Sequence, residues 1–304
     1  MNGPKKREAY IGIPHVDPNL LWNYELLIPP KETQQLIVSK IEELFSELDK
    51  GVESLKTAQQ QLKVYRQSLL KWAFEGKLTK SEFRSQNSEL AMAAEGKEKY
   101  RNGELPEGWR MKKLSELSVL VSDGDHLPPP KSESGIPFIT ISNIKNNTID
   151  FSQTMFMTEK YYNELKESRK PIKGDILYSV TGSFGIPVLI NFDKKFCFQR
   201  HIGLIRPQKS TNTKWLFYIL QSPQIFKQAT ETATGTAQKT VALKSLRNFD
   251  IPLPPISDQQ LIVSELESKL TVCDKIEETI NNGLQQSEGL RQSILKQAFE
   301  GRLV

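Results

Sequence analysis

The short motifs that come nearest to catalytic sites lack the spacing that catalysis requires. The segment Gly182-Ser183-Phe184-Gly185 does not have the spacing of a nucleophile elbow, so a turn is the favoured interpretation. A nuclease site of the carboxylate-lysine type could be built from Asp175, Glu164 and Lys166, but these residues occur in the wrong order. The chain also lacks a G-x-x-x-x-G-K phosphate loop and the Asn/Asp-Pro-Pro-aromatic loop of adenine methyltransferases. We therefore expect no catalytic residues.

Histidine and cysteine usage gives no sign of a metal site. His15, His126 and His201 have no metal-ligand spacing, and Cys197 and Cys273 lie far apart with no CxxC pattern. Two reduced thiols predict a cytoplasmic protein. No apolar run approaches the ~18 residues that a membrane helix needs, and the basic N-terminus has no apolar stretch behind it, so we expect neither a membrane span nor a secretory signal.

Positive charge is concentrated in the middle of the chain. Residues 106–255 contain 20 Lys and Arg against 13 Asp and Glu, or +7, while the net charge of the whole chain is +5, which leaves −2 for the remainder. Such an excess suggests a polyanion partner, of which nucleic acid is the commonest. An ordinary soluble surface is an equally good explanation from composition alone.

The chain contains an internal repeat that organises its architecture. Residues 28–78 match residues 253–303 at a constant offset of 225, with about 24 of 51 positions identical. Each copy begins with a proline pair and closes with glycine at Gly76 or Gly301, which predicts a long helix in each. Ser257, with Gln260 three residues later, fits a capping box, and Thr33 is the candidate cap of the first copy.

Both copies carry an apolar stripe with the alternating four-three spacing of a coiled coil. In the first copy the stripe comprises Ile41, Leu44, Leu48, Gly51, Leu55, Ala58, Leu62, Tyr65, Leu69 and Trp72. In the second it comprises Leu266, Cys273, Ile276, Ile280, Gly283, Leu290 and Ile294, interrupted at Lys269 and Ser287. A helix with one apolar stripe needs a partner helix, so we expect the two copies to pair as an antiparallel coiled coil about 65 Å long.

The region between the two copies has the sequence pattern of a mixed α/β domain. Short apolar runs at 136–141, 175–180, 186–192 and 201–205 predict strands, and 158–168 and 213–231 predict helices, the latter interrupted at Pro223. The expected fold is therefore α+β, with one mixed α/β domain and two long helices. The expected order is a remnant of another domain (1–27), a first long helix (28–78), a linker (79–105), the mixed domain (106–252) and a second long helix (253–304).

Several sequence motifs mark the mixed domain and the helix that follows it. The mixed domain opens with LPEGW, and the following helix begins with LPPISDQQLIV and closes with SILKQAFEGRLV. Together these motifs resemble the specificity subunit of type I restriction-modification systems, and GDILYSVTGSFG, FQRHIGLIRP and GTAQKTVALKSL resemble weaker recurring segments of that family. The resemblance implies a non-catalytic subunit in which two target-recognition domains each read half of a bipartite DNA site. Its implied partners are double-stranded DNA, methyltransferase subunits that use S-adenosylmethionine, and an ATP- and Mg-dependent restriction subunit.

This sequence departs from that pattern because it has one recognition domain. It is similar to a half-subunit, and a homodimer of it would be expected to read an inverted repeat, since two-fold protein symmetry is mirrored in the DNA site. No cofactor is expected in this chain. The rival interpretation is a coiled-coil adaptor whose middle domain binds protein. Affinity for nucleic acid that falls with rising salt concentration would favour the DNA-recognition subunit over this adaptor.

Polar residues in turn-flanked positions of the mixed domain are the candidates for DNA contacts. Base discrimination requires side chains that hydrogen-bond groove edges, whereas lysines bind phosphates. The candidates for base edges are Asn143, Ser183, Gln199, Arg200, His201 and Gln238, and those for phosphates are Lys131, Lys145 and Lys239. Arg200 is the leading candidate because arginine can bind guanine with two hydrogen bonds, whereas a packed strand residue is the stronger interpretation of His201.

Residues near the two helix ends are candidates for binding a partner subunit. Lys71, Trp72 and Phe74 in the first copy correspond to Lys296, Gln297 and Phe299 in the second. The aromatic positions could dock a methylating subunit, but packing at the end of the helix is the favoured alternative.

Overall fold

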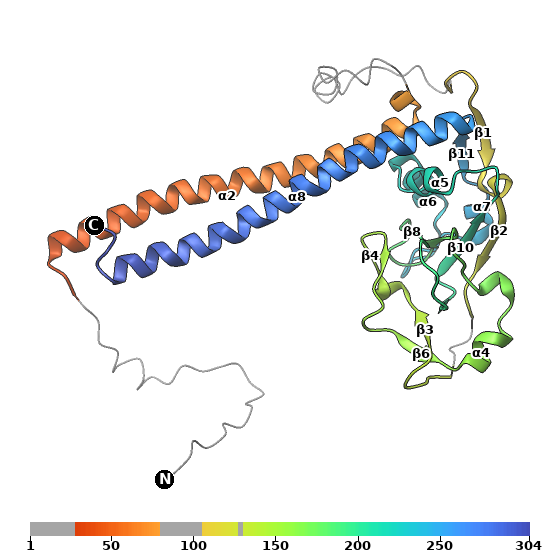
Figure 1. Cartoon of the computed structure of the whole chain (residues 1–304), viewed down its shortest axis with the longest axis horizontal. Helices are drawn as coiled ribbons and strands as arrows, with labels where there is room; N and C mark the ends of the chain where they lie inside the picture. The colour runs from red at the N-terminus through yellow and green to blue at the C-terminus, as the bar shows by residue number, and fades with distance from the viewer. Residues whose placement is uncertain (1–27, 80–104, 127–129) are drawn as a thin grey trace, which may run out of the picture. The chain divides into compact units, whose positions relative to one another are not determined.

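The computed structural model describes residues 28–79, 105–126 and 130–304, so the predicted remnant and nearly all of the predicted linker lie outside the described residues. Figure 1 shows its helices and strands. By its internal contacts, the chain divides into two compact units. The first unit contains residues 28–58 and 279–304, and the second contains the described residues between 59 and 278. Among the helices of these ranges, none combines the length and the hydropathy that crossing a bilayer would require.

Each copy of the repeat forms one long helix, α2 (Lys31–Phe74) and α8 (Ile256–Phe299), with 44 residues apiece. Gly76 and Gly301 follow the helices with φ of 69° and 68°, a left-handed conformation that favours glycine. Gly76 also lies against Trp109 and Pro106 of the LPEGW motif, where an added Cβ would come within 2.5 Å of the proline ring. The glycine therefore allows the end of α2 to pack against the start of the mixed domain.

The predicted helix caps were wrong in both copies. Thr33 and Ser257 lie inside their helices, because α2 and α8 begin earlier, at Lys31 and Ile256. The entry is instead stabilised by a repeated glutamine. Gln34 Nε2 donates to Pro29 O at 2.7 Å, and its counterpart Gln259 donates to Pro254 O at 2.9 Å.

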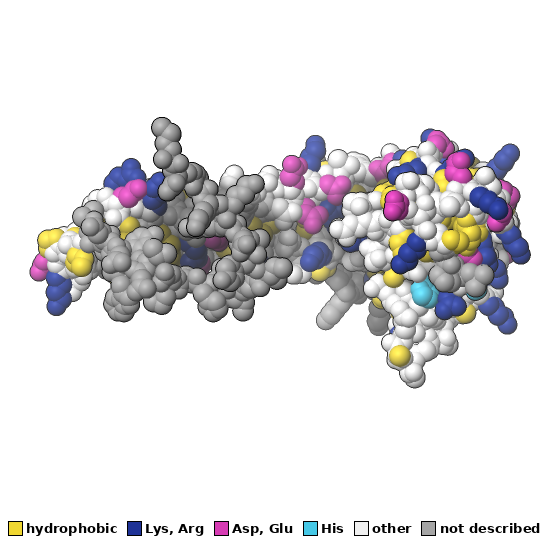
Figure 2. Space-filling model, turned by 90° about the horizontal axis from the view of Figure 1, so that it is seen from below, with side chains coloured by type: hydrophobic (Ala, Val, Ile, Leu, Met, Phe, Trp, Pro, Cys, Tyr) yellow, Lys and Arg dark blue, Asp and Glu magenta, His cyan; other side chains and the backbone are white. Residues whose placement is uncertain are grey.

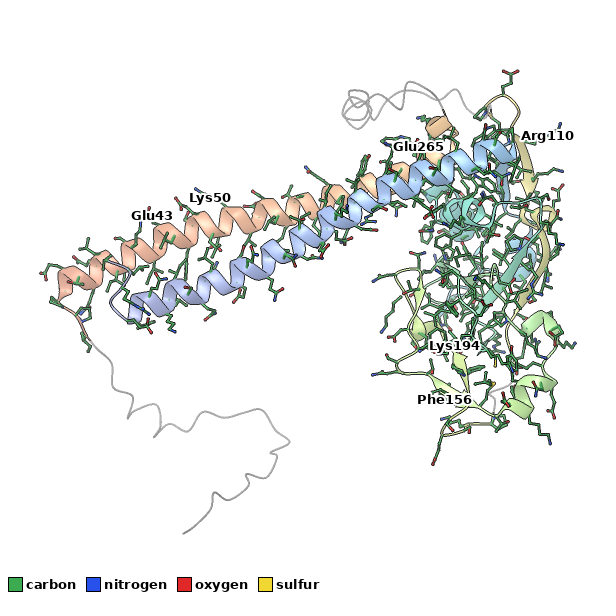
Figure 3. All side chains as sticks on the ribbon, in the orientation of Figure 1. Glu43, Lys50, Arg110, Phe156, Lys194 and Glu265 are labelled. Carbon is green, nitrogen blue, oxygen red and sulfur yellow. The ribbon has the colours of Figure 1, made fainter. Side chains whose placement is uncertain are left out.

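In the first unit, the two helices contact each other in opposite order along the chain. Asp49 pairs with Arg291, whose guanidinium also lies 4.5 Å from the ring centre of Phe45. Closer to the other end of this unit, Leu55 packs against Gly283, where a Cβ would approach to 3.1 Å. The polar faces point away from this contact, as Glu43 and Lys50 show in Figure 3.

In the second unit, the two helices are joined by buried stripe residues and a charged bridge. Leu62, Leu69, Leu266 and Cys273 are buried, and Arg66 binds Asp274 at 2.7 Å and Glu277 at 2.9 Å. Partial burial lowers the pKa of Arg66, but the hydrogen bond to Asp274 and the nearby charges of Asp274 and Glu277 together outweigh it, so the pKa is raised. Three stripe positions were predicted wrongly, since Ile276 in this unit and Gly51 and Leu290 in the first unit are exposed.

In its described residues, the mixed domain contains four small sheets, and each of the four predicted strands is present. The central sheet has the order β2-β10-β7-β8, with every neighbouring pair antiparallel. A second sheet has the order β6-β3-β9, in which β3 pairs antiparallel with β6 and parallel with β9. The strands are β1 (Arg110–Lys113), β2 (Ser118–Asp123), β3 (Ile136–Ile139), β4 (Ile144–Lys145), β5 (Thr148–Ile149), β6 (Met155–Met157), β7 (Ile176–Ser179), β8 (Pro187–Leu189), β9 (Cys197–Phe198), β10 (Ile202–Pro207) and β11 (Asp250–Leu253).

Short helices and one large apolar core complete this unit. The predicted helix at 213–231 forms α5 (Thr213–Ile219) and α6 (Pro223–Thr232), with Ser222 capping α6 just before its first-turn proline. The other helices are α4 (Glu159–Glu164) and α7 (Leu243–Arg247). The core joins residues of both main sheets: Ile139, Ile144, Leu177, Val188, Ile190, Phe196, Phe198, Ile202 and Leu204. It fixes the loop between β9 and β10 relative to both sheets.

Candidate nucleic-acid interface

The three residues between β9 and β10 have a fixed backbone and unpaired side chains. The Gln199 N–H donates to Ile139 O at 3.0 Å, the Arg200 N–H donates to Asp125 O at 2.9 Å, and His201 O accepts from Val180 N at 3.0 Å. Within the described part of the chain, the side chains of Gln199, Arg200 and His201 make no hydrogen bond or ion pair. The backbone of these residues is thus held in place, and their side chains are available to a ligand.

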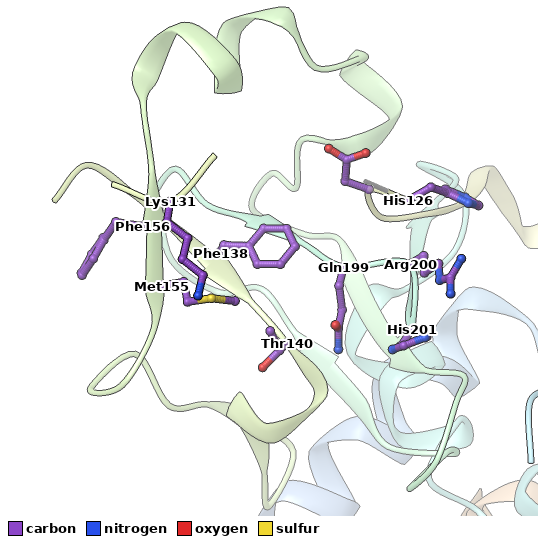
Figure 4. Close-up of a pocket in the computed structure, with 10 residues that line it drawn as sticks. His126, Lys131, Phe138, Thr140, Met155, Phe156, Gln199, Arg200 and His201 are labelled. Carbon is purple, nitrogen blue, oxygen red and sulfur yellow. The ribbon is translucent and has the colours of Figure 1, made fainter. Parts of the chain in front are cut away.

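These side chains line a cavity of about 270 Å³ (Figure 4). In Figure 4, Lys131 and Met155 lie on one side of it, Gln199 and His201 on the other, and Phe138 and Thr140 between them. The complete lining is Asp125, His126, Lys131, Phe138, Thr140, Met155, Phe156, Gln199, Arg200 and His201. Four of the predicted contact residues, Lys131 and residues 199–201, therefore come together from two separate segments of the sequence.

A second cavity, of about 380 Å³, shares His126, Arg200 and His201 with the first. Its far side is formed by Thr181 and by a loop that contains Gln238. That loop is held by Lys239 O, which accepts from Gly182 N at 3.0 Å, and by bridges of Thr240 to Thr181 and Thr234. The exposed side chains of Ser183 and Lys239 lie next to this junction in sequence, outside the lining of either cavity. Figure 2 shows lysine and arginine side chains beside a histidine on the face that it presents.

Two predicted contact residues lie elsewhere and are engaged within the domain. Asn143 is buried: its Oδ1 accepts from Thr140 N at 2.9 Å, and its Nδ2 donates to Asp150 O and Gln153 O at 3.2 Å. Its amide shapes the β4–β5 hairpin and is not presented to a ligand. Lys145 is exposed on β4 and pairs with Asp150 at 3.2 Å. Hydrogen bonds from Ser152, and then Lys145, lower the pKa of Asp150 to about 2.

Sequence reasoning missed the charged network behind the first cavity. Asp125 is buried and binds the hydroxyl of Tyr161 and, at 3.2 Å, Arg169 Nη1. His126 Nε2 lies 2.6 Å from Asp123 Oδ2. Burial, followed by the hydrogen bond to Asp125, raises the pKa of Tyr161. The available signal was the acidic pair of Asp123 and Asp125 around Gly124, whose Cα faces the backbone of Phe198 so closely that a Cβ would lie 2.1 Å from its oxygen.

The carboxylate considered for a nuclease site has a structural partner. Asp175 is buried and receives two hydrogen bonds of 2.8 Å from Arg206, and its Oδ2 also accepts from Ile172 N. The bond to Asp175 raises the pKa of Arg206. In the described ranges, no group of three or more His, Cys, Asp or Glu residues is arranged to hold a metal ion.

The residues predicted to dock a partner differ between the two helix ends. Trp72 is buried and makes an edge-to-face contact with Tyr65 at 6.2 Å, and Phe74 is half-buried. Trp72 thus has the packing role considered as the alternative. In the second copy, the Phe299 side chain is 75% exposed. Lys71 and Lys296 are both exposed and each lies 3.9 Å from the glutamate four residues on.

Comparison with known proteins agrees with the motifs. The family described as "Type I restriction modification DNA specificity domain" matches residues 106–286. The chain is 28% identical to the EcoBI specificity subunit of Escherichia coli over 96% of its length and 29% identical to the EcoKI specificity subunit of Escherichia coli (strain K12) over 91%. It spans 61% and 57% of these two relatives, respectively.

Solved structures share the fold. A chain of a type I R-M system superimposes with a TM-score of 0.72 at 22% identity, covering 95% of this chain and 64% of that one. The HsdS subunit from Thermoanaerobacter tengcongensis superimposes with a TM-score of 0.54 at 22% identity, covering 97% and 65%. The α+β class predicted from the sequence is confirmed by these structures. The chain therefore belongs to the type I restriction-modification specificity family, whose members are the non-catalytic components of these systems.

Proposed function

We propose that this chain recognises double-stranded DNA, reads one half of a bipartite site, and positions methyltransferase and restriction subunits on it. The observation that carries the proposal is that the unpaired side chains of Gln199, Arg200 and His201 line one cavity, and that Arg200 and His201 also line the adjoining one. They lie in the region of the sequence that carries the excess positive charge. Polar side chains that stand on a fixed backbone and have no internal partner are available to hydrogen-bond the edges of bases in a groove.

The side-chain chemistry suggests distinct roles. Arg200 is suited to the two acceptors of guanine, and the amides of Gln199 and Gln238 are suited to adenine. Lys131 and Lys239 have no ion pair within the described ranges and would bind phosphates. Lys145 already pairs with Asp150, so its contribution would be weaker. Ser183 and His201 would supply additional hydrogen bonds.

The two long helices would set the distance between two DNA-recognition domains. At 1.5 Å per residue, 44 residues extend about 66 Å, on the order of two turns of B-DNA. The opposite order of the contacts between α2 and α8 supports an antiparallel coiled coil. Such a spacer would leave the DNA between the half-sites unread.

The unequal burial of the two repeats supports a homodimer. Gln-Gln-Leu-Ile-Val occurs in both copies, and at 259–263 it packs against the mixed domain: Gln259 Oε1 accepts from Asn212 N at 2.9 Å, and Val263 is buried. At 34–38, Leu36 is 61% and Val38 is 52% exposed. We infer that the mixed domain of a second copy covers residues 34–38, and a two-fold dimer would then read an inverted repeat.

The catalytic chemistry would come from partner subunits. Methylating subunits would bring S-adenosylmethionine, a restriction subunit would bring ATP and Mg, and this chain would hold no cofactor. The exposed Phe299 is the best aromatic anchor for such a subunit, since aromatic residues dominate binding energy at interfaces. Lys296 lies on the same end of α8. Trp72, being buried, is a poor anchor.

Binding to a randomised duplex library over a range of salt concentrations tests the proposal. We expect selection of a defined sequence and affinity that falls linearly with log salt concentration. Arg200→Ala should relax selection at one base pair, with a loss of about 1–3 kcal/mol, and Lys131→Ala should lower the salt slope by about one without changing the sequence. Arg110→Ala is the matched control, since Arg110 is an exposed arginine on β1, away from both cavities.

The oligomeric state is tested in parallel. Light scattering at two protein concentrations would measure the expected dimer, whose selected site should be an inverted repeat. DNA affinity that is absent or insensitive to salt would refute DNA recognition and would favour the adaptor with a protein-binding middle domain.

A further inference from the structure

The cavity beside residues 199–201 has one apolar wall. The base and phosphate contacts proposed above do not involve this wall. The wall is built from β3 and β6, where Phe138 lies directly opposite Met155 in the antiparallel register. Phe138 is almost completely buried, whereas Met155 is 40% exposed and its thioether reaches the cavity. The opposite side presents the unpaired amide of Gln199 (Figure 4). An apolar surface therefore faces the amide of Gln199 across this cavity.

Cationic side chains surround this opening. Lys131 lies beside Met155, and Arg200 lines the opposite side next to Gln199. Neither cation has an ion pair with any residue in the described ranges. A ligand that fits this cavity therefore carries negative charge near the two cations, hydrogen-bonding groups opposite Gln199, and a small apolar group against Met155.

Duplex DNA offers one such combination. The major groove presents hydrogen-bond donors and acceptors on every base pair, but its only common apolar group is the 5-methyl group of thymine. Glutamine is suited to the two major-groove groups of adenine, N6 and N7. An amide and an apolar wall within one cavity therefore match A·T base pairs.

We propose that Met155, backed by Phe138, contacts the 5-methyl group of a thymine in the target site, next to the base that Gln199 reads. This inference rests on the proposed DNA recognition and adds a specificity-determining residue to it. Met155 is an unbranched thioether that adapts its shape to an apolar group. It discriminates thymine from cytosine and from uracil by the methyl group, and not by a hydrogen bond.

The test uses the duplex that the unaltered chain selects from the randomised library. Each thymine is replaced in turn by deoxyuridine, which removes only the methyl group. We expect one position at which affinity falls about fourfold, the value for one buried methyl-sized group. In the Met155→Ala variant this thymine–uracil difference should vanish, while the salt dependence of binding is unchanged. Met155→Leu should retain the difference because it keeps an apolar side chain of similar volume.

A matched control is available in the same unit. Ile172 is an exposed apolar residue that lines neither cavity, so Ile172→Ala should bind the thymine and uracil duplexes as the unchanged protein does. Thermal denaturation checks that each variant is folded. Since Met155 is on an edge strand and partly exposed, its replacement should change the melting temperature little.

The outcomes separate this inference from the proposed function. Selective, salt-dependent binding with no thymine in the half-site, or with equal affinity for every uracil duplex, would overturn the role of the apolar wall and leave DNA recognition intact. A thymine–uracil difference that persists in Met155→Ala would show that another residue reads the methyl group. Absence of any selective DNA binding would refute both.

Discussion

The duplicated glutamine allows one substitution to be made in two environments of the same chain. Gln259 and Gln34 occupy equivalent positions of the repeat, and each donates to the carbonyl of the first proline in its pair. Gln259 is 2% exposed and also accepts from the backbone of Asn212 at 2.9 Å, whereas Gln34 is exposed. We expect Gln259→Ala to destabilise the chain strongly and Gln34→Ala to have almost no effect on the isolated protomer.

The magnitude follows from the hydrogen bonds that are lost. Gln259→Ala leaves the N–H of Asn212, which caps α5, and the carbonyl of Pro254 without their partner. Leaving a buried polar group unsatisfied costs about 1–3 kcal/mol, so we expect the free energy of unfolding to fall by about 2 kcal/mol. For a unit of this size, the melting temperature should fall by about 4–8 °C. Gln34→Ala removes one exposed bond, and surface substitutions of this kind stay within about 0.5 kcal/mol.

Denaturant unfolding and calorimetry of both variants at low protein concentration provide the assay. Equal destabilisation by the two substitutions would refute this prediction. It would mean that the burial of Gln259 against the mixed domain makes no difference to the stability of the chain. A second measurement addresses the proposed dimer. If a second copy covers residues 34–38, Gln34→Ala should raise the dissociation constant of the dimer, and an unchanged constant would contradict that arrangement.

Three further predictions concern the mixed domain. Asp175→Asn should lower the free energy of unfolding by about 3–5 kcal/mol, measured by denaturant titration, because it breaks the bidentate pair with Arg206 and leaves that cation uncompensated; a loss below about 1 kcal/mol would contradict this. Hydrogen bonds from Ser152 lower the pKa of Asp150 to about 2, so its contribution to stability is present above about pH 4 and is lost as the pH falls toward 2. Asp150→Asn should therefore weaken the dependence of the melting temperature on pH between pH 4 and 2. An unaltered dependence would show that the Asp150 carboxylate does not contribute to stability in this range. Burial raises the pKa of Cys197 to about 12, so a maleimide at pH 7 should label this thiol only after unfolding, and rapid labelling of the native protein would be inconsistent with its burial.

Local rules were sufficient to predict the elements of this protein. Proline at the start and glycine at the end located α2 and α8, and the apolar periodicity identified most of the residues buried between them. The capping prediction failed because it relied on short-range spacing, whereas the observed bond joins the side chain of Gln34 or Gln259 to a carbonyl five residues earlier. Ile276 and Leu290 fit the stripe but are exposed, because periodicity does not show where the partner helix lies.

The amino-acid sequence by itself determined the repeat, the strand and helix order and the family, since these depend on residue type and on spacing along the chain. Only the tertiary structure decided which polar residues form the site. It brought Lys131 and residues 199–201 to one cavity, and it buried the amide of Asn143 within the β4–β5 hairpin. It also gave the identical residues Gln34 and Gln259 different surroundings. The physical reason is that burial and hydrogen-bond partners come from segments distant in the chain, which local spacing does not encode.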